Sequence, residues 1–321
     1  MDLRSIDTYN ISIMELRHLR YFVRVASELH FGRAAEQLGI SQPPLSQQIR
    51  QLEVELGVQL FERSSRRVRL TVAGRLFLDE ARATLERAEH AISVTRRAAR
   101  GELGELSFGL SASALFTPIF ADALTTFRRR YPDVHLDLTE RALTAQREAV
   151  AAGTLDIGLV RSGRRLVLPP DVSATALATD RMYVAMRIDH RLASTDTVID
   201  VAELADEPMV HYPYDFEGFQ EDLHRLFGNA GLRPRIVQEA HEMSTLLGLV
   251  SAGLGITVLP ASLRRLHIAN LHYREIGGDD ALSRMWLIRN VVRPRPTALA
   301  FLDLILPHGQ TLPDSAPPET R

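Results

Sequence analysis

Two adjacent prolines, Pro43 and Pro44, stand directly before a strongly helical stretch, and they constrain the fold more than any other feature of the sequence. Proline lacks a backbone N–H and has φ fixed near the helical value, so a helix tolerates it only in the first turn. The sequence therefore predicts a helix that begins here, with Ser41 or Gln42 as its cap. Apolar residues follow at helical spacing and define the face that we expect to be buried: Leu45, Ile49, Leu52 and Leu56.

The opposite face of this helix is short and polar, with a cation at its far end, and carries Pro43, Ser46, Gln47 and Arg50. Glutamine and arginine can pair bidentately with base edges in the major groove of DNA, which admits one α-helix. The alternative is a helix surface that only faces solvent. Helices predicted over residues 14–30 and 31–38, with a turn at residues 39–41, complete a helix-turn-helix and favour the DNA interpretation.

An alternating pattern follows over residues 57–70 and predicts a two-stranded wing that bends at Ser64 and Ser65. Its arginines, which are Arg63, Arg66, Arg67 and Arg69, are either a solvated charge run or contacts to phosphates and the minor groove. Thr71 then caps a helix predicted over residues 72–100. The apolar strip of this helix is incomplete for a monomer and predicts pairing with a second copy of the chain: Leu76, Ala83, Leu85, Ala88 and Ile92.

Charge is distributed unevenly along the 321 residues. Residues 1–100 hold 16 arginines and 12 acidic residues, a balance of +4, whereas the remainder has a balance of −6, which gives the net charge of −2. Only the N-terminal third is therefore expected to meet a polyanion. All 38 basic residues are arginine and cysteine is absent, which excludes disulfides, thiolate chemistry and lysine Schiff bases. With no apolar run of ~20 residues and no leader pattern, we expect a cytoplasmic protein without a membrane partner.

Residues 101–105 are expected to form a hinge, after which strands and helices alternate. This alternation predicts an α/β domain with a mainly parallel, doubly wound sheet. Two lobes joined by two crossings are expected, lobe I from residues 106–176 and 267–307 and lobe II from 177–266, with a ligand between them at the strand ends. A disordered tail is expected over residues 308–321.

The sequence does not match the motifs of catalytic sites that it partly resembles. The stretch GLSAS is not G-x-S-x-G, GLGITV lacks the third glycine of a dinucleotide motif, and the 11 histidines have no metal-ligand spacing. We therefore predict no enzyme activity, no metal and no cofactor. A solute-binding protein for transport is a further alternative, which the N-terminal 100 residues argue against.

From Met14 onward the sequence MELRHLRYFVRVASELHFGRAAEQLGISQPPLSQQIRQLEVELGVQLFERSSRRVRLTVAGRLFL resembles the LysR-type transcriptional regulators. The resemblance implies a winged helix-turn-helix over residues 14–71, a dimerising linker helix over 72–100 and a periplasmic-binding-protein-like (type 2) effector domain over 106–307. Residues 1–13 would then be an N-terminal extension. It also implies a homodimer or homotetramer on double-stranded promoter DNA, with RNA polymerase as a further partner and the nucleoid as its place in the cell. DNA contacts are expected from Arg33, Ser41, Gln42, Pro43, Ser46, Gln47, Arg50, Arg63, Arg66 and Arg67.

The effector half is most similar to the branch that controls benzoate, catechol and chlorocatechol degradation, through LSFGLSASALF, TAQREAVAAGTLDIGLVR and EMSTLLGLVSAGLGITVLPAS. This implies an activator of an aromatic catabolic operon whose inducer is an aromatic acid or a muconate. The matching positions are Ser111, Ser113, Leu143, Thr144, Arg161 and Phe219. Leu143 stands where the branch usually has a carboxylate-binding threonine, so a non-aromatic inducer is an alternative. Structural alternatives for the others are helix caps for the serines, an ion pair for Arg161 and core packing for Phe219.

Overall fold

The computed structural model describes residues 14–63, 67–163, 166–213 and 218–306. Internal contacts divide the chain into two units, Met1–Arg96 and Arg97–Arg321, which we describe separately. The expected N-terminal extension over residues 1–13, the wing bend at Ser64 and Ser65, and the tail over residues 308–321 lie outside the described residues.

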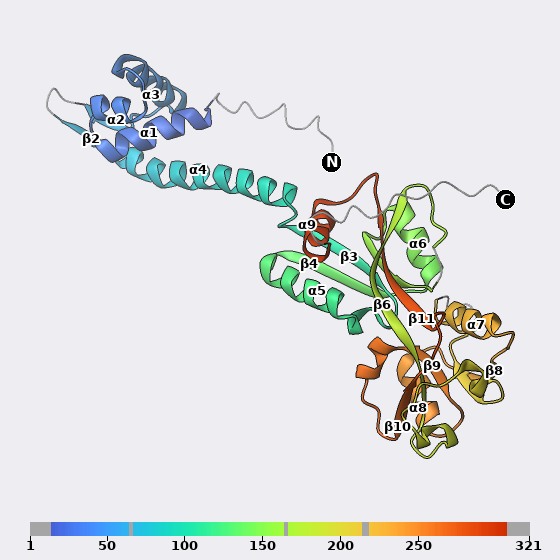
Figure 1. The fold of residues 1–321 in the computed structure, drawn as a ribbon. Coiled ribbons are helices and arrows are strands. Elements are labelled where there is room, and N and C mark those ends of the chain that lie inside the picture. The colour runs from blue at the N-terminus through green and yellow to red at the C-terminus, as the bar shows by residue number, and fades with distance from the viewer. Residues whose placement is uncertain (1–13, 64–66, 164–165, 214–217, 307–321) are drawn as a thin grey trace. The chain divides into compact units, whose positions relative to one another are not determined.

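The first unit is a helix-turn-helix with a wing, followed by a long helix that continues past the unit boundary (Figure 1). Its elements are α1 (Leu16–Glu28), α2 (Phe31–Gln37), α3 (Gln42–Leu56), β1 (Phe61–Arg63), β2 (Val68–Leu70) and α4 (Val72–Ala99). Ser41 is the N-cap of α3 and both prolines lie in its first turn, as predicted. Leu45, Ile49 and Leu52 are fully buried, but Leu56 is 36% exposed, because α3 ends there and Gly57 turns the chain with φ of 67°.

The wing is an antiparallel pair in which Phe61 lies opposite Leu70. Glu53 on α3 fastens it, since one carboxylate oxygen accepts the backbone N–H groups of Leu60 at 3.0 Å and Phe61 at 3.1 Å. The first strand of the wing is therefore attached directly to the helix with the predicted DNA-reading face.

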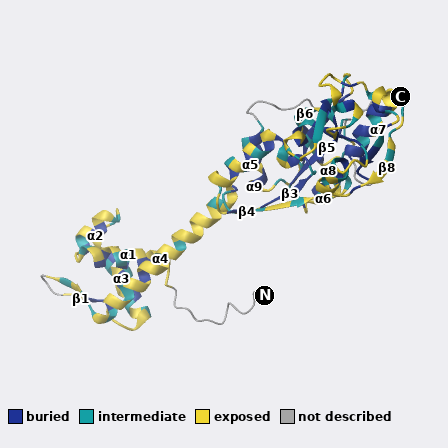
Figure 2. Cartoon of the chain, turned by 90° about the horizontal axis from the view of Figure 1, so that it is seen from below, coloured by how far each residue is buried: buried dark blue, intermediate teal, exposed yellow. Residues whose placement is uncertain are grey.

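Helix α4 begins with the predicted cap: the Thr71 hydroxyl accepts the N–H of Gly74 at 2.9 Å and donates to the carbonyl of Gln59 at 2.8 Å. Only its first half packs on the helix-turn-helix, through Gly74 and Ala81 among others. Figure 2 shows α4 as largely exposed. Leu76 is 68% exposed and Ile92 49%, whereas Leu85 and Ala88 of the predicted strip are partly buried.

The second unit is a two-lobed α/β domain (Figure 1). Its strands are β3 (Gly104–Leu110), β4 (Val134–Glu140), β5 (Ile157–Arg161), β6 (Val172–Arg187), β7 (Pro208–His211), β8 (Arg235–Glu239), β9 (Thr257–Pro260), β10 (Leu271–Glu275) and β11 (Leu282–Asn290). Its helices are α5 (Pro118–Arg130), α6 (Leu143–Ala152), α7 (Phe219–Asn229), α8 (Met243–Ser251) and α9 (Pro296–Ile305).

Strand β6 belongs to both lobes. Its first half pairs with β11, from Val172 opposite Asn290 to Arg181 opposite Leu282. Its second half pairs with β10 on one side and with β9 on the other. Within the described residues the sheet order is therefore β4-β3-β5-β11-β6 in lobe I and β10-β6-β9 in lobe II.

This arrangement corrects two expectations. The sheet is mixed rather than mainly parallel, because β11 runs antiparallel to β5 and β6 and both neighbours of β6 in lobe II are antiparallel to it. The lobe boundary at residue 267 was also wrong. Residues 271–275 pair with the second half of β6, so the chain returns to lobe I only after Glu275.

Each lobe has its own hydrophobic core. In lobe I, α5 and α9 pack on one face of the sheet, where Phe108 and Phe301 meet edge to face with ring centroids 4.8 Å apart, while α6 packs on the other face. In lobe II, Met182 and Phe227 belong to a separate cluster. Across the described helices, none combines the length and apolar character needed to span a membrane.

Candidate functional site

The predicted DNA-reading residues share the outer face of α3. Pro43, Gln47 and Arg50 are exposed and Ser46 is half-buried, opposite the buried leucines and isoleucine of the same helix. Ser41 and Gln42 are exposed at its start. The first unit therefore exposes a polar face of α3 with Arg50 at its end, while the opposite face of the helix is packed in the core.

The predicted arginines outside α3 divide into two groups. Arg67 and Arg69 are exposed on the wing, while Arg66 lies outside the described residues. Arg33 is exposed but donates to the Glu28 carbonyl at 2.7 Å and lies 3.3 Å from its carboxylate. Arg63 is not a free wing-tip cation: it pairs with Glu53 at 2.6 Å, and its guanidinium lies 5.0 Å from the centre of the Phe31 ring. Its contacts join the wing to α2 and α3.

A small pocket opens between the lobes of the second unit. Lobe I supplies the carboxyl ends of β3, β4 and β5 and the first turn of α6, and lobe II supplies the first residue of α7. Four of the six predicted effector residues line it: Ser111, Leu143, Arg161 and Phe219. Glu140, Arg141 and Gln146 also line it and were missed.

The other two predicted effector residues do not line this pocket. Ser113 is fully buried, and its hydroxyl accepts a hydrogen bond from Arg161 Nε at 2.8 Å. Ser113 therefore fixes the position of Arg161 without lining the pocket itself. Thr144, in the first turn of α6 after Leu143, also lies outside the residues that line the pocket.

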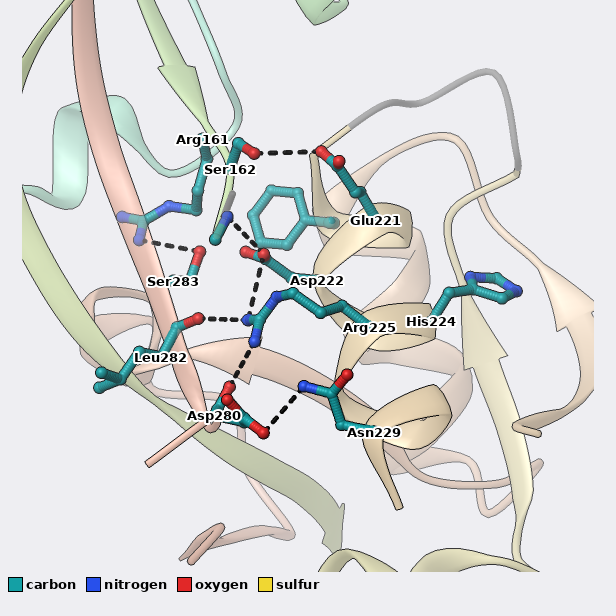
Figure 3. A network of polar contacts seen from close by, with 12 residues as sticks. Arg161, Ser162, Glu221, Asp222, His224, Arg225, Asn229, Asp280, Leu282 and Ser283 are labelled. Atoms are coloured by element: carbon teal, nitrogen blue, oxygen red, sulfur yellow. Dashed lines mark hydrogen bonds and ion pairs between the residues drawn. The ribbon is translucent and has the colours of Figure 1, made fainter. Parts of the chain in front are cut away.

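The Arg161 guanidinium turns into the protein, where the side chain is 1% exposed. Nη2 pairs with Asp180 on β6 at 2.8 Å and donates to Ser262 of lobe II at 3.2 Å. Nη1 donates to Ser283 on β11 at 3.5 Å (Figure 3). Burial lowers the pKa of Arg161 and the Asp180 carboxylate opposes that shift. Of the two interpretations offered for Arg161, the structure shows the ion pair, and it connects the lobes.

A second polar network connects α7 to lobe I (Figure 3). Ser162 donates to Glu221 at 3.1 Å, and the N–H of Gly163 donates to Asp222 at 2.6 Å. Arg225 donates to the carbonyls of Asp280 and Leu282, in the segment that returns to lobe I, at 2.7 and 2.6 Å. Asp222 is buried, which raises the pKa of its carboxyl group. The sequence pattern gives no signal for these contacts, because they join residues about 60 positions apart.

The pocket wall offers three kinds of recognition. The amino end of α6, at Ala142 and Leu143, presents backbone N–H groups and the positive end of a helix dipole. Phe219 presents a ring that stacks on Tyr212 with centroids 5.5 Å apart. Glu140 adds a carboxyl group whose pKa is raised by burial and, to a smaller extent, by the charge of Glu242. The wall can therefore take an anionic group at one end and an apolar group at the other.

Comparisons with known proteins agree with this architecture. Residues 16–75 match the family described as bacterial regulatory helix-turn-helix protein, lysR family, and residues 99–310 match the LysR substrate binding domain. The chain is 44% identical to the uncharacterized HTH-type transcriptional regulator YnfL of Escherichia coli over 276 residues, which is 86% of this chain and 92% of that protein. It is 36% identical to the HTH-type transcriptional regulator BenM of Acinetobacter baylyi, over 87% of this chain and 91% of BenM.

Solved structures show the same similarity. Full-length CbnR in complex with its target DNA superposes with a TM-score of 0.78 and 29% identity, covering 91% of this chain and 98% of CbnR. The BenM effector binding domain with its effector benzoate superposes with a TM-score of 0.57 and 26% identity, covering 63% of this chain and 90% of that domain. Curated and solved relatives are regulators rather than enzymes. The chain belongs to the LysR family of DNA-binding transcriptional regulators.

Proposed function

We propose that this regulator activates an aromatic catabolic operon in response to a small aromatic acid or a muconate-like carboxylate bound between the lobes. The observation that carries the proposal is the pocket wall, in which the amino end of α6 and Phe219 line one pocket. The similarity to BenM, whose effector domain was solved with benzoate, supports the aromatic assignment.

On DNA, α3 enters the major groove of a promoter and Ser46, Gln47 and Arg50 contact base edges, while Arg67 and Arg69 on the wing contact phosphates. The exposed apolar residues of α4 pair two subunits, and the effector domains assemble a tetramer. RNA polymerase is recruited at the same promoter, so the protein acts in the cytoplasm, on the nucleoid.

In the pocket, the inducer carboxylate accepts N–H groups from the first turn of α6 and the hydroxyl of Ser111, and its apolar part packs on Phe219. Leu143 contributes only its backbone N–H. Binding shifts the angle between lobes because the ligand contacts residues of both. An inducer must bind one arrangement more tightly than the other, since equal affinity for both would shift nothing.

A footprint on the DNA upstream of its own gene tests the proposal directly. We expect DNase I protection that shortens when benzoate or cis,cis-muconate is added, with catechol as the matched aromatic without a carboxylate. Protection that is indifferent to all three compounds would reject the aromatic inducer. No protection at low salt would reject promoter binding.

The role of α3 is tested by Arg50→Ala, which should weaken specific binding by about 1–3 kcal/mol and relax discrimination at the base pairs it contacts. Arg129→Ala, at an exposed position on α5, changes the charge equally and should leave the footprint unaltered. An unchanged affinity and footprint for Arg50→Ala would remove Arg50 from base recognition.

A regulator with a non-aromatic inducer is the second candidate. Two residues favour it: Leu143 offers no hydroxyl, and Glu140 places a carboxyl group in the wall, which disfavours a ligand with two carboxylates. Calorimetric titration of the purified protein with benzoate and cis,cis-muconate separates the two candidates, because this one predicts no binding heat for either.

A further inference from the structure

A second small pocket lies on lobe I, away from the one between the lobes. It is formed where α6 ends, where β11 ends and where α9 begins. Three of its lining residues are arginines, namely Arg289, Arg293 and Arg295, and one, Asp156, is acidic. The pocket therefore concentrates positive charge in a unit of the protein that is acidic on the whole.

Asp156 is already committed to other partners. Its carboxylate accepts the N–H of Ser107 at 2.9 Å and the Ser107 hydroxyl at 2.8 Å, and it lies 3.4 Å from the Arg295 guanidinium. One arginine is thus neutralised. The charges of Arg289 and Arg293 stay uncompensated within the pocket.

Arg289 carries the clearest sign of a ligand. Its Nε is buried and has no hydrogen-bond partner among the residues that the structure describes. A buried donor without a partner costs about 1–3 kcal/mol, and more when it is charged. An anion in the pocket would neutralise the Arg289 guanidinium and so lower that cost.

The backbone around the arginines also favours an anion. The Asn290 side-chain oxygen accepts the N–H groups of Val292 at 2.9 Å and Arg293 at 3.1 Å, which fixes the turn. Helix α9 then starts at Pro296, and Ala298 of its first turn lines the pocket. First-turn N–H groups and the helix dipole favour an anion at this end.

We propose that this pocket binds a tetrahedral oxyanion, a phosphate group in chemical class, through Arg289, Arg293 and the first turn of α9. Arginine binds phosphate bidentately with a planar fork of donors. Here the donors come from a strand end, a turn and a helix start. Donors from three separate segments suit the four oxygens of a tetrahedral group better than the two coplanar oxygens of a carboxylate. The ligand is either free phosphate or the phosphate of a small ester.

Such a ligand would act on the segment that follows α4. Gly101 has φ of +70°, and a Cβ there would lie 2.8 Å from the Thr297 nitrogen in the first turn of α9. Thr297 also donates to the carbonyl of Glu105 at 2.8 Å. The first turn of α9 thus lines the anion site and also contacts residues 101–105. A bound anion would therefore affect these residues independently of the pocket between the lobes.

The test is calorimetry and thermal unfolding of the full-length protein with inorganic phosphate and with glycerol phosphate, at constant ionic strength with chloride as the balancing salt. We expect saturable binding of at least one of them and a raised melting temperature. Tighter binding of glycerol phosphate identifies an ester as the natural class, and tighter binding of inorganic phosphate identifies the free ion. The double variant Arg289→Gln/Arg293→Gln should lose at least tenfold in affinity.

Arg129→Gln, an exposed arginine of the same lobe, is the matched control and should bind phosphate like the parent. Arg293→Gln alone, at an exposed position, reports on the site should the double variant not fold. A rise in stability that does not saturate, or equal phosphate affinity in parent and variants, would overturn the proposal. The response to benzoate or muconate should persist in these variants, which separates this site from the proposed inducer site.

Discussion

His211 is fully enclosed at the end of β7, where Nε2 lies 3.3 Å from the carbonyl oxygen of Phe219. Burial lowers its pKa from 6.5 to about 4. Between these two values the unfolded chain binds a proton that the folded chain does not, so His211 favours folding fully above pH 6.5 and loses that contribution as the pH falls toward 4. At pH 5 the loss should be about 2 kcal/mol.

Urea unfolding at pH 7 and pH 5 checks this prediction, with His211→Gln as the variant that cannot titrate. The free energy of unfolding should fall less between the two pH values in the variant than in the parent. An equal fall in both proteins would mean that His211 is protonated in the folded state.

The ion pair between Arg161 and Asp180 is expected to contribute to the stability of the effector domain. Asp180→Asn should destabilise the effector domain by about 3–5 kcal/mol, because it leaves a buried guanidinium without its counter-charge. Chemical denaturation monitored by circular dichroism gives the number. Arg181→Gln, next in the chain and part of an exposed 3.8 Å contact with Glu275, should change little. Similar effects from the two substitutions would show that Arg161 does not depend on Asp180.

The effector roles predicted from sequence stay predictions, but the positions of some of these residues follow from a chain segment alone. Ser111 and Phe219 stand at the ends of predicted elements and do line the pocket. Ser113 was misplaced because a short 3-10 turn at Ala114–Phe116 begins there and turns its hydroxyl toward Arg161. Glu140 was missed because nothing in its own stretch distinguishes a pocket carboxylate from an exposed one.

At the scale of elements, the wing depends on α3 through one carboxylate. Glu53→Gln removes the charged partner of Arg63 and weakens the two N–H bonds to the wing, and it should cost about 1–3 kcal/mol. Amide hydrogen exchange is the sharpest measurement, since the amides of Leu60 and Phe61 should exchange faster. Glu55→Gln, on the same helix, is the control for charge. Unaltered exchange at Leu60 and Phe61 would show that the strand is held by packing alone.

Most elements followed from sequence, whereas their neighbours in the sheet did not. The first half of β6 gives no strand signal in the sequence, because its residues, SATALATD, are small or polar. The stretch Leu271–Glu275 was assigned to lobe I, but it pairs with the half of β6 that belongs to lobe II. Alternation predicts an extended strand and its buried face, but it does not identify the partner strand.

At the scale of the whole molecule, the proposed pairing of two subunits depends on α4. Leu76→Glu together with Ile92→Glu places charges at two exposed apolar positions, one on each side of α4, and should shift the protein toward monomer in sedimentation velocity experiments. DNA affinity should fall with it, since two linked half-sites bind more tightly than one. The double variant Arg82→Gln/Glu89→Gln, on exposed positions of the same helix, is the control. A stable dimer of the leucine and isoleucine variant would move the subunit interface elsewhere.

Because β6 is hydrogen-bonded into both lobes, the effector domain has a continuous spine rather than two bodies on a flexible tether. Translation of one lobe past the other would break the ladders on both sides of that strand, but torsion about its axis would keep them. We therefore expect any change that a bound molecule causes in the angle between the lobes to be a twist about β6, limited in size by that strand and by the contacts of Arg161 and Arg225 between the lobes.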